Sequence, residues 1–487
     1  MAPFCYKCTQ IVAIFIFVTC AKILCIPAYR STDFDVHRNW LAITRNLPLK
    51  EWYFDDVNKT TVHTLDYPPS FSFFEYTIST NPLTNWLVSS GRLDEKCLAL
   101  LPDSDNHPSK ACVVFHRGTV ILSDIILWIG AFSACKSYRN FLLIVLNPGL
   151  LWLDHIHFQY NGAMLGILIG SLGELVKGND ATGYAYHYHH LASCFLYSLL
   201  LTMKHLYLPL APLYFVYILS TYCLQGNRIL WFNFFNVAAI AAGTLVLPFL
   251  PFVLQQNPIE QMQQMASRLF PFARGLVHDY WAANMWAIWM LADKLAQRMT
   301  GFPLPEISPS VCTFFLITAL IPGLFCAWNA TPRTFLYCVV FCALSSFMFA
   351  YHVHEKAIMT AIIPLGIFCE SDNEKRLFLR LNTLGLVGLF PLLFRPTELM
   401  LKITSLISYT MLTYHLFGET KLMQMDWSGL SLLCIVILFL EIIHPLVIFP
   451  RMEFLPLLCT SIACAVGLIF CWILSGILMA RSRQSRI

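Results

Sequence analysis

Residues 454–479 read FLPLLCTSIACAVGLIFCWILSGILM, and no charged side chain interrupts them. About 20 consecutive apolar residues in a helix are enough to cross the ~30 Å hydrocarbon core of a bilayer. An uncharged run of this length is typical of a transmembrane helix rather than of the core of a soluble domain. This stretch therefore predicts that the chain is embedded in a membrane.

The composition of the whole chain leads to the same prediction. Of its 487 residues, 57% are hydrophobic and 12% are charged, with a mean hydropathy of +0.61, so polar side chains are too few to coat a water-soluble globule. Similar apolar runs recur at 9–27, 119–135, 140–153, 161–176, 184–203, 206–223, 230–253, 310–328, 335–350, 357–369, 377–394, 398–416 and 429–449. We therefore expect one membrane domain over residues 1–487: an all-α polytopic protein with about 14 transmembrane helices and the lipid bilayer as its solvent.

Charge and cysteine content narrow the possible partners and compartments. Lys and Arg number 32 against 28 Asp and Glu, and no basic tract is long enough to bind nucleic acid. The 18 cysteines are scattered mostly singly through apolar runs, as packing residues are. Cys97 and Cys112 are exceptions, since they bracket a polar stretch and could form a disulfide in an oxidising compartment.

The orientation follows from the bias of short basic loops toward the cytosol. If residues 281–300 do not span the membrane, the basic loops fall on one side when the helices alternate; they carry Lys136, Arg139, Lys177, Arg228, Arg333, Lys375, Arg376, Lys421, Arg481, Arg483 and Arg486. Both termini are then cytosolic, and the polar segments 28–118 and 254–309 are lumenal. If residues 281–300 span the membrane, the predicted orientation of every later segment inverts.

The first lumenal segment opens with STDFDVHRNW at residues 31–40, which predicts a helix capped by a hydroxyl or acid and followed by acids in its first turn. Asp33, Asp35 and Arg38 are candidate functional residues here. The structural alternative is helix capping plus a surface ion pair. Because the helix begins where the first span ends, Asp33 would face a substrate that arrives on a lipid carrier.

Two further polar motifs interrupt the apolar pattern. Asp66 and Tyr67 precede a diproline turn, where an acid and an aromatic ring could line a sugar pocket. Residues 154–161, DHIHFQYN, are too polar for a core, and their candidate ligands for sugar or phosphate are Asp154, His157, Gln159 and Asn161. Asp154, His155 and His157 could also hold a metal ion. Asp124 lies within an apolar run, where interhelical hydrogen bonding is the expected role.

Basic side chains near the predicted membrane boundary are candidate partners of a lipid phosphate. His354, Glu355 and Lys356 interrupt a strongly apolar region, and Lys204 and Arg274 lie beside aromatic residues. The alternatives are a local Glu355–Lys356 ion pair and lysine or arginine side chains that extend to the lipid headgroups.

Taken in order, the segments 32–40, 65–69, 154–161, 268–275 and 352–356 resemble those of the dolichyl-phosphate-glucose-dependent glucosyltransferases of asparagine-linked glycosylation, enzymes with the GT-C membrane fold. The resemblance covers nearly the whole chain. Residues 36–44 and 281–284 are more similar to the members that add the second glucose than to those that add the first.

This resemblance implies an endoplasmic reticulum enzyme with a lumenal active site. It implies glucose transfer from dolichyl phosphate glucose to Glc1Man9GlcNAc2 diphosphodolichol, forming an α-1,3 bond with inversion and without a cofactor or metal. Asp33 matches the family's catalytic base. Cations hold the leaving phosphate, for which Arg274, Lys356, Lys204 and His354 are the candidates. The remaining candidates orient sugars.

Other functions are compatible with a polytopic chain. A first-glucose transferase is the alternative within the family, and a transporter of lipid-linked sugars or a scaffold subunit is the alternative outside it. The chain lacks a convincing internal repeat, and its polar motifs gather on one predicted face rather than at the membrane midplane. Both features favour an enzyme.

Overall fold

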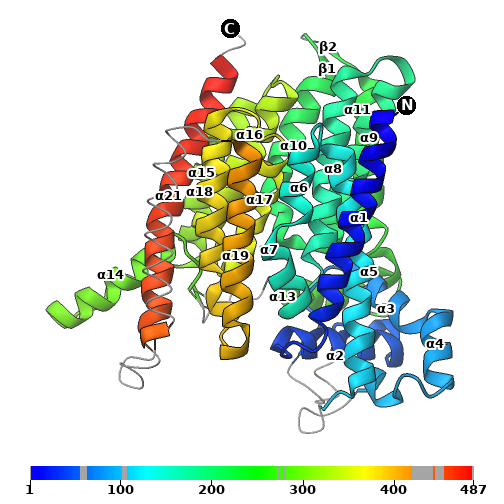
Figure 1. Cartoon of the computed structure of the whole chain (residues 1–487). Helices are drawn as coiled ribbons and strands as arrows, with labels where there is room; N and C mark the ends of the chain where they lie inside the picture. The colour runs from blue at the N-terminus through cyan, green and yellow to red at the C-terminus, as the bar shows by residue number, and fades with distance from the viewer. Residues whose placement is uncertain are drawn as a thin grey trace.

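The computed structural model describes residues 2–54, 63–100, 107–226, 228–270, 275–277, 281–418, 442–444 and 454–484. Within these ranges the regular structure is almost entirely helical (Figure 1). The sheet found there is a single two-stranded hairpin, β1 (Leu224–Gln225) with β2 (Arg228–Ile229), paired in antiparallel register. The prediction of an all-α fold is confirmed.

The helices follow one another along the chain with short connections. The first half contains α1 (Ala2–Leu24), α2 (Thr32–Asn46), η1 (Leu49–Glu51), α3 (Pro69–Thr80), α4 (Pro82–Ser89), η3 (Glu95–Leu98), α5 (Lys110–Ala134), α6 (Tyr138–Val145), α7 (Pro148–Leu150), η5 (Leu151–Ile156), α8 (Asn161–Asp180), α9 (Gly183–Met203), η6 (His205–Leu210), α10 (Ala211–Ile218) and η7 (Leu219–Cys223). The second half contains α11 (Trp231–Val246), α12 (Leu250–Val253), α13 (Pro258–Leu269), α14 (Met285–Thr300), α15 (Pro309–Ala327), α16 (Pro332–Phe349), η9 (Glu355–Ile358), α17 (Met359–Gly366), α18 (Asp372–Gly388), η10 (Phe390–Leu392), α19 (Pro396–Phe417) and α21 (Leu455–Gln484).

The long helices run side by side as one bundle (Figure 1). The start of α1 and the end of α21 lie at the same end of the bundle. Helices α2, α3, α4 and α13 lie at the other end, which we call the α2 end.

Five helical segments of the described chain are long and apolar enough to cross a membrane: 110–134, 205–223, 309–327, 332–349 and 455–484. Two shorter apolar helices, 9–24 and 231–246, coincide with further predicted runs. The run 140–153 is divided among α6, α7 and η5 because Pro148 begins a new helix. The run 429–449 lies almost wholly outside the described residues. A polytopic membrane protein is confirmed.

Helix α14 covers most of the segment that was expected not to span. It has 16 residues and lies across the long axes of the bundle rather than along them (Figure 1). Its later apolar side chains, Leu295 and Met299, are exposed. Its orientation agrees with the expectation that residues 281–300 do not span.

Helices α5 and α8 approach closely because small residues line their contact. A Cβ atom at Gly166 would lie 2.6 Å from the backbone of Ile126, and one at Gly173 would lie 2.8 Å from Ala134 Cα. Small residues allow this backbone approach within a membrane. The contact holds α8 against α5 from Gly166 to Gly173.

The α2 end is closed by a disulfide between Cys97 and Cys112, which ties η3 to the first turn of α5. The sequence alone did not determine whether this disulfide forms.

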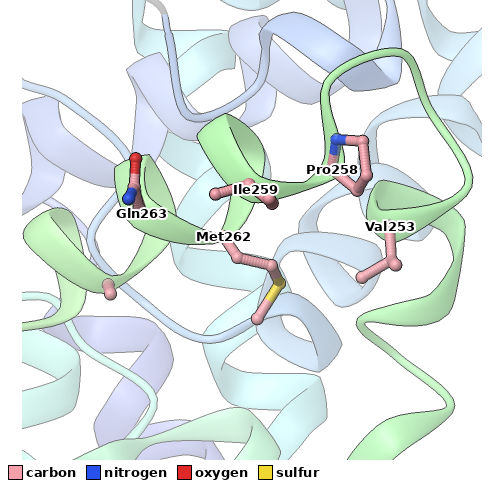
Figure 2. A pocket seen from close by; sticks show the side chains of 6 residues that line it. Val253, Pro258, Ile259, Met262 and Gln263 are labelled. Carbon is pink, nitrogen blue, oxygen red and sulfur yellow. The ribbon is translucent and has the colours of Figure 1, made fainter.

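A groove of about 440 Å³ lies between Val253 and α13 and is lined by apolar side chains with one glutamine (Figure 2). The side chains that line this groove include no titratable group, so the groove offers no acid or base for a reaction.

Candidate functional site

The start of α2 places Asp33 in the first helical turn. Ser31 is the N-cap, and its Oγ accepts a hydrogen bond from Phe34 N at 3.4 Å. The positive end of the helix dipole favours a carboxylate at this position. The Asp33 side chain is one quarter exposed, so it remains accessible from solvent.

Three side chains from distant parts of the chain meet Asp33. Lys356 Nζ and Gln159 Nε2 each donate to Asp33 Oδ2 at 2.5 Å. His157 Nε2 lies 3.2 Å from the same oxygen. Since every contact to the carboxylate found in the described chain is made to Oδ2, Oδ1 is left to accept a proton.

The surrounding charges determine the protonation states of these groups. Burial would raise the pKa of the Asp33 carboxyl, but the charge of Lys356 and the contact with His157 outweigh it and hold this pKa well below its usual range. Burial and the charge of Lys356 lower the pKa of His157. The Nε2 side of the His157 ring faces Asp33, and its Nδ1 lies 3.2 Å from the Tyr29 hydroxyl, which donates to Leu392 O at 2.7 Å.

A chain of hydrogen bonds extends from Asp33 to a second lysine. Gln159 Oε1 accepts from Asn161 Nδ2 at 2.8 Å, and Asn161 Oδ1 accepts from Lys204 Nζ at 2.9 Å. The Lys204 ammonium lies 5.0 Å from the ring centre of Tyr67, a cation–π distance. Burial, with the charge of Lys356, lowers the pKa of Lys204 to about 8.

Asp154 fixes Asn161, which is part of this series of hydrogen bonds. Its Oδ1 accepts from both nitrogens of Asn161 at 3.0 Å, and its Oδ2 accepts from Gly162 N at 2.5 Å. These bonds cap the start of α8, where Tyr160, the N-cap residue, provides no side-chain bond. The turn before it includes Phe158 at φ 81°, a left-handed conformation that costs on the order of 1–3 kcal/mol for a non-glycine residue. Such backbone strain clusters at functional sites.

The segment that carries Lys356 is held by the second long polar segment. His352 N donates to Leu276 O at 3.0 Å, and Val353 forms a parallel bridge with Val277. Glu355 is 3% exposed, and neither carboxylate oxygen has a hydrogen-bond partner in the described chain. Burial raises the pKa of Glu355 to about 7, which leaves this acid partly protonated near neutral pH.

Comparison with known proteins identifies the family of the chain that builds this site. The model of the ALG6, ALG8 glycosyltransferase family matches residues 18–475. The chain belongs to the ALG6, ALG8 glycosyltransferase family.

Several relatives of known name extend along almost the whole chain. It is 35% identical to a mouse protein, with 96% of each chain covered, and 38% identical to a protein of Gibberella zeae, with 93% of this chain and 95% of the relative covered. It is 32% identical to a protein of Arabidopsis thaliana, with 94% and 96% covered. All three relatives are named dolichyl pyrophosphate Glc1Man9GlcNAc2 alpha-1,3-glucosyltransferase.

Most of the residues predicted for this family member meet in one cluster. We define the Asp33 cluster as Asp33, Tyr67, Asp154, His157, Gln159, Asn161, Lys204 and Lys356. Glu355 adjoins it through Lys356. The alternative of a local Glu355–Lys356 ion pair is wrong, because Lys356 bonds Asp33 instead. Asp124 of α5 accepts from Lys22 Nζ of α1 at 2.6 Å, which confirms its interhelical role, and it lies 2.8 Å from His155 Nε2.

Other predicted residues lie outside the Asp33 cluster as defined, and some of them adjoin it. Asp35 pairs with Arg30 at 3.2 Å, and Arg38 is buried and donates to Ala99 O. Both bonds brace the first polar segment. Asp66 and His354 adjoin Tyr67 and Glu355 in sequence, and the charge of Asp66 acts on both Tyr67 and Lys204 of the cluster. Arg274 lies outside the described residues, so its role stays a prediction.

The structure adds two residues that the sequence motifs did not reveal. Tyr29 contacts His157, and the Arg395 guanidinium lies 5.2 Å from the centre of the Tyr29 ring. Arg117 is 2% exposed and donates to backbone carbonyls on both sides of the site. Neither residue belongs to a dense polar motif, and a lone arginine beside an apolar run is ordinarily interpreted as a membrane-boundary residue.

Proposed function

We propose that this protein transfers glucose from dolichyl phosphate glucose to the terminal glucose of Glc1Man9GlcNAc2 diphosphodolichol and forms an α-1,3 bond. The observation that supports this proposal best is the Asp33 carboxylate, which Lys356, Gln159 and His157 contact through Oδ2 alone. The names of relatives at 35–38% identity support the acceptor. The donor is inferred from the resemblance of the motifs.

In the proposed reaction, Asp33 Oδ1 takes the proton of the acceptor hydroxyl. The hydroxyl oxygen forms its bond to C1 of the donor glucose while the bond from C1 to the phosphate oxygen breaks. Dolichyl phosphate departs with the electron pair. Attack opposite the leaving group converts a β-linked donor into an α-linked product.

The phosphate leaving group carries negative charge as it departs, and fixed cations stabilise that charge. Lys356 is suited to this role because it stands beside the base and has further N–H donors beyond the one given to Asp33. Lys204 is a second cation, linked to the base through Asn161 and Gln159. A phosphate is already a good leaving group, so no dedicated general acid is needed.

We also propose that the α2 end faces the lumen of the endoplasmic reticulum and that both termini are cytosolic. A disulfide at the α2 end fits an oxidising compartment. The basic loops between α5 and α6, between β1 and β2, and before α16 lie at the opposite end, where α21 ends (Figure 1). Asn58 and Asn329 each begin an Asn-X-Thr glycosylation sequon, at residues 58–60 and 329–331. Glycosylation mapping tests this orientation, with modification expected at Asn58 and not at Asn329.

The transfer assay uses the purified protein, dolichyl phosphate glucose and three separate lipid-linked acceptors that carry Man9, Glc1Man9 or Glc2Man9. Extension of Glc1Man9 alone is expected. Extension of Man9 instead would move the protein to the first glucose step and overturn the acceptor assignment. Absence of transfer to all three acceptors by a folded preparation would overturn the proposed activity.

A further inference from the structure

Arg117, near the start of α5, has an unusual environment for a buried cation. Its Nη2 donates to Tyr29 O at 2.9 Å and to Ile156 O at 3.1 Å, and its Nη1 donates to His155 O. All of its hydrogen bonds in the described chain go to backbone carbonyls. Burying a guanidinium without a carboxylate partner is costly, so stability alone does not explain this residue.

The three carbonyls belong to the two segments that meet at the reacting carboxylate. Tyr29 precedes the α2 cap, and residues 155–156 come directly before His157. The two segments are also joined to each other, because Ser31 Oγ donates to His157 O and the Tyr29 hydroxyl contacts His157 Nδ1. One planar guanidinium therefore bridges the backbones that carry Asp33 and His157.

Asp124 contacts one of these segments from two turns further along α5, about 10 Å along the axis at 1.5 Å per residue. Its Oδ2 accepts from Lys22 Nζ of α1 at 2.6 Å, and His155 Nε2 lies 2.8 Å from the same oxygen. Residue 155 is thus held through its carbonyl by Arg117 and through its ring by Asp124. The close contact of α5 with α8 makes α5 a fixed frame for both residues.

We propose that Arg117 is a positioning residue that holds His157 and Asp33 in register for the transfer reaction. Asp124 supports it by contacting the ring of His155. This inference rests on the proposed function for its kinetic consequence. The guanidinium is required because its planar fork reaches three carbonyls at once. A lysine ammonium keeps the charge but has neither the reach nor the fixed geometry.

The experiment compares Arg117→Lys with the wild type and with a matched control, Arg45→Lys. Arg45 also donates to a backbone carbonyl, that of Ser79, and to Asn85 Oδ1 at 3.0 Å, but it lies in the last turn of α2 away from Asp33. The kinetic readout is kcat at saturating donor and acceptor, with the KM of each. The second readout needs no activity: hydrogen exchange of backbone amides in residues 151–160.

Arg117→Lys is expected to lower kcat 10- to 100-fold, because displacing a reacting group by about 1 Å has effects of that size. Each KM should change less than about threefold, and amide exchange in residues 151–160 should accelerate. Arg45→Lys should leave kcat and this exchange unchanged. If Arg117→Lys does not fold, Arg117→Gln replaces it, since it has no charge to bury.

Wild-type kcat together with wild-type exchange in the folded Arg117 variant would overturn the positioning role. A loss confined to KM would do the same. If the wild-type protein transfers glucose to no acceptor, the proposed function fails, while the exchange comparison still tests whether Arg117 fixes residues 151–160.

Discussion

An Asp33→Asn substitution replaces one carboxylate oxygen by an amide nitrogen and leaves the shape of the side chain unchanged. The remaining amide oxygen can still accept from Lys356 and Gln159, which contact Oδ2 at 2.5 Å in the wild type. The amide nitrogen then occupies the Oδ1 position, where the acceptor hydroxyl would lose its proton. This variant therefore removes the proposed base while it keeps the contacts that orient the side chain.

The expected loss of rate follows from the role of a general base, which contributes 10²- to 10⁴-fold. The expected loss of stability is small. The Asp33 and Lys356 side chains are 25% and 12% exposed, so their ion pair lies between a surface pair, worth about 0–1 kcal/mol, and a buried pair, whose disruption costs about 3–5 kcal/mol. We expect a decrease of about 1–2 kcal/mol in the free energy of unfolding.

The assay measures kcat for transfer to the Glc1Man9 acceptor alongside the thermal unfolding midpoint. Asp35→Asn is the matched control, because Asp35 stands in the same helical turn but pairs with Arg30 outside the Asp33 cluster. Asp35→Asn should retain kcat within about threefold, as expected for a partly exposed ion pair outside the cluster. Near-normal turnover by a folded Asp33→Asn protein would refute the assignment of Asp33 as the base.

Three other variants test the charges around the site and the disulfide at the α2 end. Because the pKa of Lys204 is lowered to about 8, the KM for the donor should rise above pH 8, where the ammonium loses its proton. Lys204→Arg should shift this rise in KM to higher pH. A rise at the same pH in the variant would contradict a contact between Lys204 and the donor phosphate. Because the pKa of Glu355 is raised to about 7, the wild-type acid is charged at pH 8 and protonated at pH 5. Glu355→Gln should therefore raise the thermal unfolding midpoint at pH 8 and leave it unchanged at pH 5. Equal effects at both pH values would argue against a buried charge. Cys97→Ser combined with Cys112→Ser opens a loop with a sequence separation of 15 and should lower the free energy of unfolding by about 3 kcal/mol with kcat retained; unfolding in denaturant measures it, and an unchanged midpoint would contradict a stabilising bond.

Much of the fold could be predicted because lipid imposes a simple condition on sequence. A membrane span must be a long apolar helix that satisfies its own backbone hydrogen bonds, so hydropathy alone located α15, α16 and α21. The same condition makes polar clusters conspicuous. Asp33, the 154–161 motif and Lys356 were found because each interrupts an apolar region near a predicted boundary.

The sequence could not show which polar groups meet. Glu355 and Lys356 are neighbours in the chain, and their pairing was a reasonable alternative, yet Lys356 bonds Asp33 across 323 positions. Asp35 and Arg38 stand on the same helix as Asp33, but they turn to Arg30 and Ala99. Spacing along one helix gives the direction of a side chain, and it says nothing of the segment packed against it.

What the sequence by itself determined is the membrane environment of this protein, its helical class and the polar segments that carry its candidate site residues, because those depend on local composition and period. The tertiary structure alone decided that Lys356, His157 and Gln159 converge on one carboxylate oxygen and that Arg117 binds the backbones beside them. Such contacts depend on how α5 packs against α8 and on how distant loops close over the bundle. That packing is a property of the whole chain, and no single segment encodes it.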